Sequence, residues 1–175
     1  KLWEINEAFF EAYGRIYEMI RDDQGGAAFH AFAIWGPGKT AKVQCDASAM
    51  FSPSMFRQFV VPPLEAQCDW LDYSMFHLDG HECIPHLDHL LAIESLDAIE
   101  WTPDPNVPPG GDPHWYEMYR RILDAGKSVQ AIGVRPDEVL PLIDAVGPEG
   151  LYVMTEFKNQ AQCDEMVKRV ESYRN

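Results

Sequence analysis

The chain has 175 residues, of which 46% are hydrophobic and 12% aromatic, a composition that indicates one globular domain and excludes a disordered chain. Its net charge of -14 repels nucleic-acid backbones and anionic lipid surfaces, so we expect neither as a partner. No run approaches the roughly 20 apolar residues of a membrane-spanning helix. Four widely spaced cysteines without a CxxC pair favour reduced thiols, and we expect a cytoplasmic protein.

The N-terminal part precedes a repeating pattern. Apolar residues from Leu2 to about Ile20 recur at helical spacing and predict a long amphipathic helix. Residues 27–35 form a short apolar segment that we expect to be loosely extended. The chain begins without Met, so we expect it to be a fragment of a longer protein.

Between residues 40 and 173 the sequence repeats one pattern five times, in which an apolar strand ends at polar residues and a helix follows. The predicted strands are 41–45, 71–76, 98–101, 129–132 and 151–154. The residues that mark helix ends are Ser52-Pro53, Asp112-Pro113, Arg135-Pro136, Gly126, Gly147-Pro148 and Asn159. Alternation of this kind indicates parallel strands joined by helical crossovers.

An α/β fold of this kind is either an open doubly wound sheet or a closed barrel. No glycine-rich loop of the GxGxxG or GxxxxGK type follows a strand, which disfavours the nucleotide-binding forms of the open sheet. Periodicity does not separate the two architectures, and we expect the five units to form most of a parallel barrel. Because an open barrel exposes strand edges and apolar interior surface, we expect the chain to need upstream residues or to form a homo-oligomer.

Four of the six histidines lie within positions 77–89, directly after a predicted strand. His77 and Asp79 lie on the same side of the chain, and Gly80 lets the backbone turn, so an imidazole and a carboxylate can converge on one metal ion. The candidates for a third ligand at other strand ends are Glu156, Glu100, Asp46 and Cys45. A structural role for His77 and Asp79 is the alternative. We expect the remaining histidines to begin a helix and lie on its wet face; they are His81, His86 and His89.

Two other strand ends carry carboxylates. Glu100 precedes Trp101 and the Pro-rich run 102–111, which we expect to shape a pocket. A carboxylate there can act as a general acid or base; the alternative is a solvated strand end beside a tryptophan that packs the rim. Asp46 follows the first predicted strand and precedes small residues that let a ligand approach, whereas Cys45 is equally a buried core thiol. The expected pocket residues are Trp101, Ser52 and Thr155.

Several of these residues occur together in a known family. Asp46, the run Ser52-Pro53-Ser54-Met55-Phe56, Phe59 and Pro62-Pro63 resemble the "D…SPemF.eF..P" stretch of the uroporphyrinogen decarboxylase superfamily. The run 76–80, Phe-His-Leu-Asp-Gly, matches its "HxxG" strand end, and residues 96–101 and 125–127 follow in the family's order. The resemblance covers about residues 40–170. It implies that residues 1–175 are a single partial TIM-barrel domain, the C-terminal five βα units of a (βα)8 barrel.

The resemblance also implies an enzyme. One branch of the superfamily contains zinc-dependent methyltransferases that act with a corrinoid protein, which implies zinc held by His77, Asp79 and Glu156. Members of that branch carry a His-x-Cys element and a distant Cys near the last strand. In this chain His77 matches the His, but Asp79 stands at the Cys position and Thr155-Glu156 end the last strand. The oxygen-rich set of His77, Asp79 and Glu156 suits zinc but weakens the case for activation of an acceptor thiol. The alternatives are a metal-free decarboxylase that uses Asp46, Glu100 and His77 for proton transfer on a small-molecule substrate, and a non-catalytic barrel fragment or ligand-binding protein.

Overall fold

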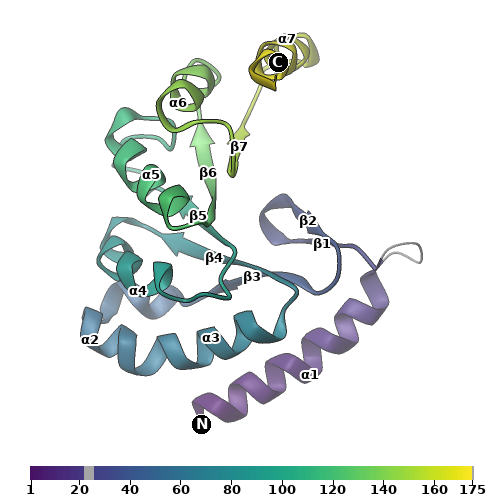
Figure 1. Cartoon of the computed structure of the whole chain (residues 1–175), viewed down its shortest axis with the longest axis vertical. Coiled ribbons are helices and arrows are strands. Elements are labelled where there is room, and N and C mark those ends of the chain that lie inside the picture. The colour runs from purple at the N-terminus through teal and green to yellow at the C-terminus, as the bar shows by residue number, and fades with distance from the viewer. Residues whose placement is uncertain (22–25, 175) are drawn as a thin grey trace. The chain divides into compact units, whose positions relative to one another are not determined.

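A computed structural model describes residues 1–21 and 26–174 and has an α/β fold (Figure 1). Five strands form one sheet in the order β3-β4-β5-β6-β7, which is also their order along the chain. The pairs β3–β4 and β6–β7 are parallel. Within the described ranges, no helix is long and apolar enough to span a bilayer.

The elements alternate as the sequence pattern predicts. The strands are Ala28–His30 (β1), Ile34–Gly36 (β2), Thr40–Gln44 (β3), Tyr73–Asp79 (β4), Ala98–Thr102 (β5), Ser128–Val134 (β6) and Leu151–Thr155 (β7). The α-helices are Leu2–Ile20 (α1), Pro53–Met55 (α2), Val61–Trp70 (α3), Leu87–Leu91 (α4), Tyr116–Asp124 (α5), Val139–Val146 (α6) and Gln160–Glu171 (α7). Other helical turns are Ala31–Ala33 (η1), Asp46–Met50 (η2), Phe56–Val60 (η3), His81–His86 (η4), Pro113–Trp115 (η5) and Ser172–Arg174 (η6).

The chain divides into two compact units. The first comprises Lys1–Leu78 and Glu82–Ala98 and holds strands β1 to β3 and β4 up to Leu78. The second comprises Asp79–His81 and Ile99–Asn175 and holds β5 from Ile99 onward, β6 and β7. Each unit has its own buried apolar residues, so each is described by itself below.

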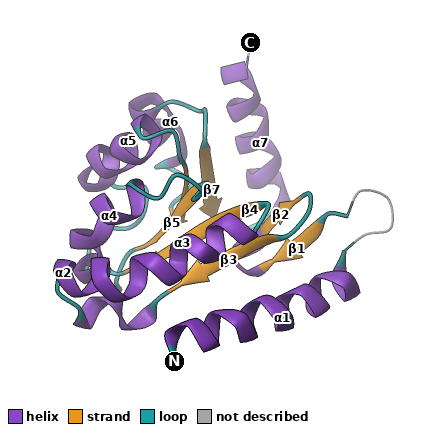
Figure 2. Ribbon diagram, turned by 60° about the horizontal axis from the view of Figure 1, so that its bottom comes forward, coloured by secondary structure: helices purple, strands orange, loops and turns teal. Residues whose placement is uncertain are grey.

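In the first unit, α1 lies beside α3, as Figure 2 shows. The buried Tyr13 hydroxyl donates a hydrogen bond to the Thr40 carbonyl at 2.6 Å, and Asn6 donates to the Pro63 carbonyl at 2.7 Å. The ring of Phe10 lies 5.1 Å from that of Trp70 at the end of α3. One face of α1 is therefore fixed to both α3 and the first residue of β3.

The segment expected to be loosely extended is an antiparallel hairpin of β1 and β2, closed by the turn η1. In this turn Phe32 has φ 63° and Ala33 has φ 55°. Residues with a Cβ seldom adopt positive φ, and each such residue costs about 1–3 kcal/mol. The backbone of the turn at the tip of the hairpin is thus strained, and the residue types Phe32 and Ala33 do not predict this conformation.

In the second unit, the Pro-rich loop 103–111 is fixed to η5 and α5. The Tyr119 hydroxyl donates to the Gly110 carbonyl at 2.6 Å, and the Trp115 indole donates to the Pro108 carbonyl at 3.0 Å. Burial raises the pKa of Tyr119, so its hydroxyl stays a donor. The loop is therefore held by side chains at both Pro108 and Gly110.

Helix boundaries follow the predicted punctuation with one exception. Asn159 caps α7, its side-chain oxygen accepting from the Gln162 amide at 3.1 Å. The predicted start of a helix at Arg135-Pro136 is wrong, because α6 begins at Val139. The Glu138 carboxylate instead accepts from the Arg135 amide at 2.9 Å and closes a turn before the helix.

Candidate functional site

Polar side chains gather on one face of the β3–β4 pair in the first unit. Strand alternation places Ser74, Phe76 and Leu78 on one face of β4 and Met75 and His77 on the other. Met75 is buried, whereas His77 is only half-buried. In the parallel register, Gln44 pairs with His77. The carboxyl end of β3 therefore presents a polar side chain next to His77.

Three residues of this face form a chain of hydrogen bonds along β3. The Lys42 ammonium donates to the Gln44 side-chain oxygen. The Gln44 amide nitrogen in turn donates to the Asp46 carboxylate at 2.6 Å. The cation and the carboxylate thereby fix the orientation of the amide between them. Together with His77, these residues are called the β3–β4 polar cluster (Lys42, Gln44, Asp46 and His77).

The β1–β2 hairpin lies against this cluster. The Phe32 ring is 4.7 Å from the His77 ring, and the Lys42 ammonium is 4.6 Å from the Phe32 ring centroid. His30 Nδ1 accepts a hydrogen bond from the Lys42 amide at 3.4 Å, and burial, with a smaller effect of Lys42, lowers the pKa of His30. His77 remains half-buried and Asp46 exposed, so solvent reaches both.

In the second unit, Glu100 and Trp101 lie on opposite faces of β5. Glu100 is 0% exposed, and its carboxylate accepts a hydrogen bond from the Thr102 hydroxyl. The alternative that Glu100 is a solvated strand end is therefore wrong. Trp101, also 0% exposed, packs 4.8 Å from the ring of Trp115, and its indole nitrogen has no hydrogen-bond partner within residues 1–21 and 26–174.

The residues that follow β4 form a tight turn. Asp79 is the exposed last residue of the strand, and Gly80 has φ +82°, a conformation that suits glycine. The Asp104 carboxylate accepts from the backbone and ring nitrogens of His81 at 2.8 and 2.6 Å. The backbone bond, followed by the ring bond, lowers the pKa of Asp104. His81 therefore secures the turn to the start of the Pro-rich loop.

The prediction that His86 lies on a wet helix face is wrong. His86 is 1% exposed, stacks 4.2 Å from the Phe56 ring, and has a ring nitrogen 2.9 Å from the Ser48 carbonyl oxygen. Its other ring nitrogen has no partner among the described residues.

Burial raises the pKa of the nearby Cys45 thiol, which keeps that thiol protonated at neutral pH.

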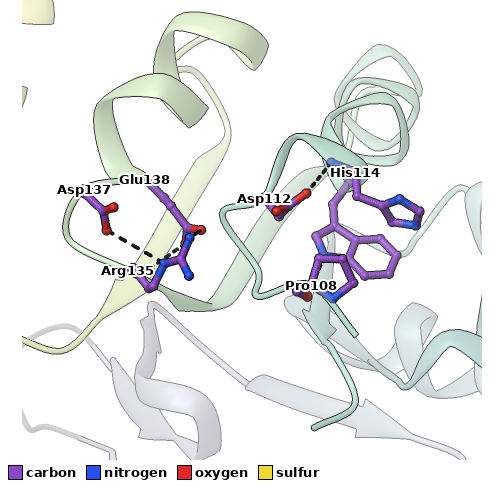
Figure 3. A network of polar contacts seen from close by, with 7 residues as sticks. Pro108, Asp112, His114, Arg135, Asp137 and Glu138 are labelled. Carbon is purple, nitrogen blue, oxygen red and sulfur yellow. Dashed lines mark hydrogen bonds and ion pairs between the residues drawn. The ribbon is translucent and has the colours of Figure 1, made fainter. Parts of the chain in front are cut away.

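The remaining predicted site residues lie elsewhere. Ser52 caps α2, and its hydroxyl accepts from the Met55 amide at 3.3 Å. Thr155, the last residue of β7, lines an apolar cavity of about 400 Å³ in the second unit. The exposed Glu156 lies in an adjoining surface pocket with Arg135, which Figure 3 shows beside Asp137 and Glu138.

The predicted metal ligands His77, Asp79 and Glu156 are distributed over both units. Across the parts of the chain that the structure describes, no group of three or more His, Cys, Asp or Glu side chains is arranged to bind one ion. The structure thus offers the β3–β4 polar cluster of the first unit and the buried Glu100 of the second as separate chemical features.

Sequence reasoning identified Asp46 and His77 but missed Lys42, Gln44 and Phe32. Lys42 and Gln44 could have been found from the alternation of apolar and polar residues in β3, in which Ala41 and Val43 are buried. Phe32 has no such signal, since it depends on the hairpin. No protein-family model matches the chain, and a search of curated proteins finds no match either.

Proposed function

We propose that the chain is part of an enzyme of the uroporphyrinogen decarboxylase superfamily that replaces a carboxyl group of its substrate with a proton. The β3–β4 polar cluster would carry out the proton transfer. The observation that carries this proposal is the hydrogen-bonded row from Lys42 through Gln44 to Asp46, beside His77 on the next strand. The sequential strand order supports the family, because neighbours in sequence are neighbours in the wall of a (βα)8 barrel.

Each group of the cluster has a role in such a reaction. Decarboxylation breaks a C–C bond, releases CO₂ and leaves an electron pair on the remaining carbon. A proton must then bond to that carbon. His77 is assigned to deliver that proton, because histidine is the side chain that most often acts as a general acid or base. The Lys42 ammonium attracts the substrate's carboxylate, and the Asp46 carboxylate stabilises positive charge on a protonated substrate.

Glu100 is included in the proposal on its own geometry. Glu100 lies in the middle of β5, and a carboxylate that is wholly buried there, with a hydroxyl donor two residues on, is an uncommon arrangement for a structural glutamate. We therefore assign Glu100 as a candidate acid–base group of the second unit, separate from the β3–β4 polar cluster.

The proposal is tested with uroporphyrinogen in D₂O, by mass spectrometry of the products. The wild-type protein is expected to yield a product that has lost CO₂ and gained one deuteron at the same carbon. Asp46→Asn is expected to reduce the rate by about 10²-fold or more, the lower range of acid–base contributions. Asp124→Asn, an exposed aspartate at the end of α5, is the matched control and should retain the wild-type rate. Equal rates for the two variants refute the assignment of Asp46.

A metal-dependent methyltransferase that acts with a corrinoid protein is the second candidate. It is favoured by the length of β4, which continues through Asp79 and so keeps His77 and Asp79 on one face of the strand. Zinc held by His77 and Asp79 would activate an acceptor. Metal analysis of the purified protein tests this candidate: one equivalent of zinc that is lost in His77→Ala supports it, and zinc retained at full occupancy in that variant contradicts it.

A further inference from the structure

An apolar cavity of about 400 Å³ lies between α6, β7 and α7 in the second unit, and the helices flank that strand in Figure 1. Its walls include Ile143 from α6, Val153 from β7, and Met166 and Val170 from α7. Neither β7 nor α7 contains a buried residue, although both carry apolar side chains on this side. The cavity is thus a space that these elements leave open.

The size and lining of the cavity are those of a ligand site. Pockets for small molecules typically measure about 300–1,000 Å³, and their walls are mostly apolar with few polar groups. Thr155 is one of the residues that line this cavity, and its hydroxyl is shielded from solvent and has no hydrogen-bond partner in the described part of the chain. A buried hydroxyl without a partner is unfavourable, and a ligand oxygen would satisfy it.

Cationic side chains mark one end of the cavity. Phe157 and Met166 are shared with an adjoining surface pocket of about 600 Å³, which Lys158 and Arg169 also line. Neither cation forms an ion pair in the described structure, although the chain has twice as many acidic as basic residues. The pocket's third cation, Arg135, is paired with Glu138 at 2.5 Å. The acidic residues of this pocket are Asp137, Glu156 and Glu165.

We propose that this cavity binds a long-chain carboxylate, with the alkyl chain in the apolar space and the carboxylate at Thr155, Lys158 and Arg169. Thr155 is three residues from Lys158, at the end of β7 where the cavity adjoins the pocket that Lys158 and Arg169 line. The hydroxyl donates to one carboxylate oxygen, and the two cations attract the headgroup. This site is independent of the decarboxylation proposed above and of the β3–β4 polar cluster.

The headgroup is tested by isothermal titration of the protein with dodecanoate and with dodecyltrimethylammonium, each below its micelle concentration. The chain's net charge of -14 favours the cationic amphiphile at any unspecific apolar surface. A site of the proposed kind reverses that order, and dodecanoate is expected to bind at least tenfold more tightly. Equal binding, tighter binding of the cation, or no binding of dodecanoate overturns the proposal.

The location is tested with variants. Lys158→Ala and Arg169→Ala are each expected to weaken dodecanoate binding about two- to fivefold, the range for exposed charge pairs. Lys168→Ala, a matched charge change at an α7 residue outside the cavity wall, should leave binding unchanged. Loss of affinity in Lys168→Ala equal to that in both other variants contradicts the assigned headgroup position.

The cavity itself is tested with Val153→Phe, which fills it. This variant is expected to reduce dodecanoate affinity at least tenfold while retaining the wild-type melting temperature or raising it. If Val153→Phe fails to fold, Thr155→Val tests the same wall with little change of volume, and its expected effect is a loss of about fivefold. Wild-type affinity in a folded variant of either kind overturns the proposal.

Discussion

Replacing Gly110 with alanine would place a methyl group against the backbone of β6. A Cβ at this position overlaps the Ile132 carbonyl oxygen and lies 3.0 Å from the Ile132 carbonyl carbon. The obstacle is strand backbone, which cannot rotate away as a side chain can. The Gly110 carbonyl also accepts the Tyr119 hydroxyl at 2.6 Å, so a shift of the loop breaks that hydrogen bond as well.

Two costs contribute to the effect of Gly110→Ala. Overpacking of this kind typically costs about 1–3 kcal/mol, and leaving the buried Tyr119 hydroxyl unpaired costs about 1–3 kcal/mol more. A shift of the loop relieves part of the overlap with Ile132 but breaks the Tyr119 hydrogen bond, so the two costs do not add in full. We expect the free energy of unfolding to fall by about 3 kcal/mol. That is a large share of the roughly 5–15 kcal/mol that stabilises a typical domain.

Urea denaturation followed by tryptophan fluorescence measures this change, with Gly126→Ala as the control. Gly126 has φ +77° and nothing within 4 Å of an added Cβ, so the control measures only backbone strain, about 1–2 kcal/mol. If Gly110→Ala is no more destabilising than Gly126→Ala, the Pro-rich loop does not lie against β6 in the way described.

Three further changes test other parts of the fold. Tyr13→Phe removes the donor to the buried Thr40 carbonyl and should lower the free energy of unfolding by about 1–3 kcal/mol in urea denaturation; no change would show that α1 is not fixed there. Asn159→Ala should cost about 1 kcal/mol by loss of the α7 cap, measured in the same way, and an unchanged value would contradict the cap. Asp104→Asn should cost up to about 1 kcal/mol at pH 7. The pKa of Asp104 in the folded state lies below its ordinary value of 3.8, so its contribution to the free energy of unfolding is present above about pH 4 and is lost as the pH falls through the folded pKa. The unfolding curves of the variant and the wild type should therefore converge in acid. Curves that stay equally separated at every pH would refute this contribution.

The five strands of the main sheet were predictable from sequence because each is a short apolar run followed by polar residues. Their ends were less predictable, since pairing with a neighbour and not residue type decides where a strand stops; β4 continues through Asp79 although polar residues begin at His77. His86 was misplaced because η4 is a 3-10 helix that contains Pro85, and its tighter winding changes which residues face inward.

The candidate site was predictable only in part for a related reason. Asp46 follows β3 directly after Cys45, and His77 lies two residues before the end of β4, where the sequence changes from apolar to polar. Lys42 and Gln44 lie within β3, and only the register with β4 shows that Gln44 is next to His77. Phe32 was beyond sequence reasoning, because its position depends on a hairpin whose tip uses positive φ at Phe32 and Ala33 without a glycine.

The release of CO₂ from uroporphyrinogen by the wild-type protein, His77→Ala and His114→Ala tests the central claim most directly. His114 is an exposed histidine of η5 and serves as the matched control. The proposed decarboxylase releases CO₂ as wild type and as His114→Ala at equal rates, while His77→Ala is slower by about 10²-fold or more. Equal rates in all three proteins, or no release by the wild type, would contradict the assignment of the β3–β4 polar cluster as a decarboxylation site.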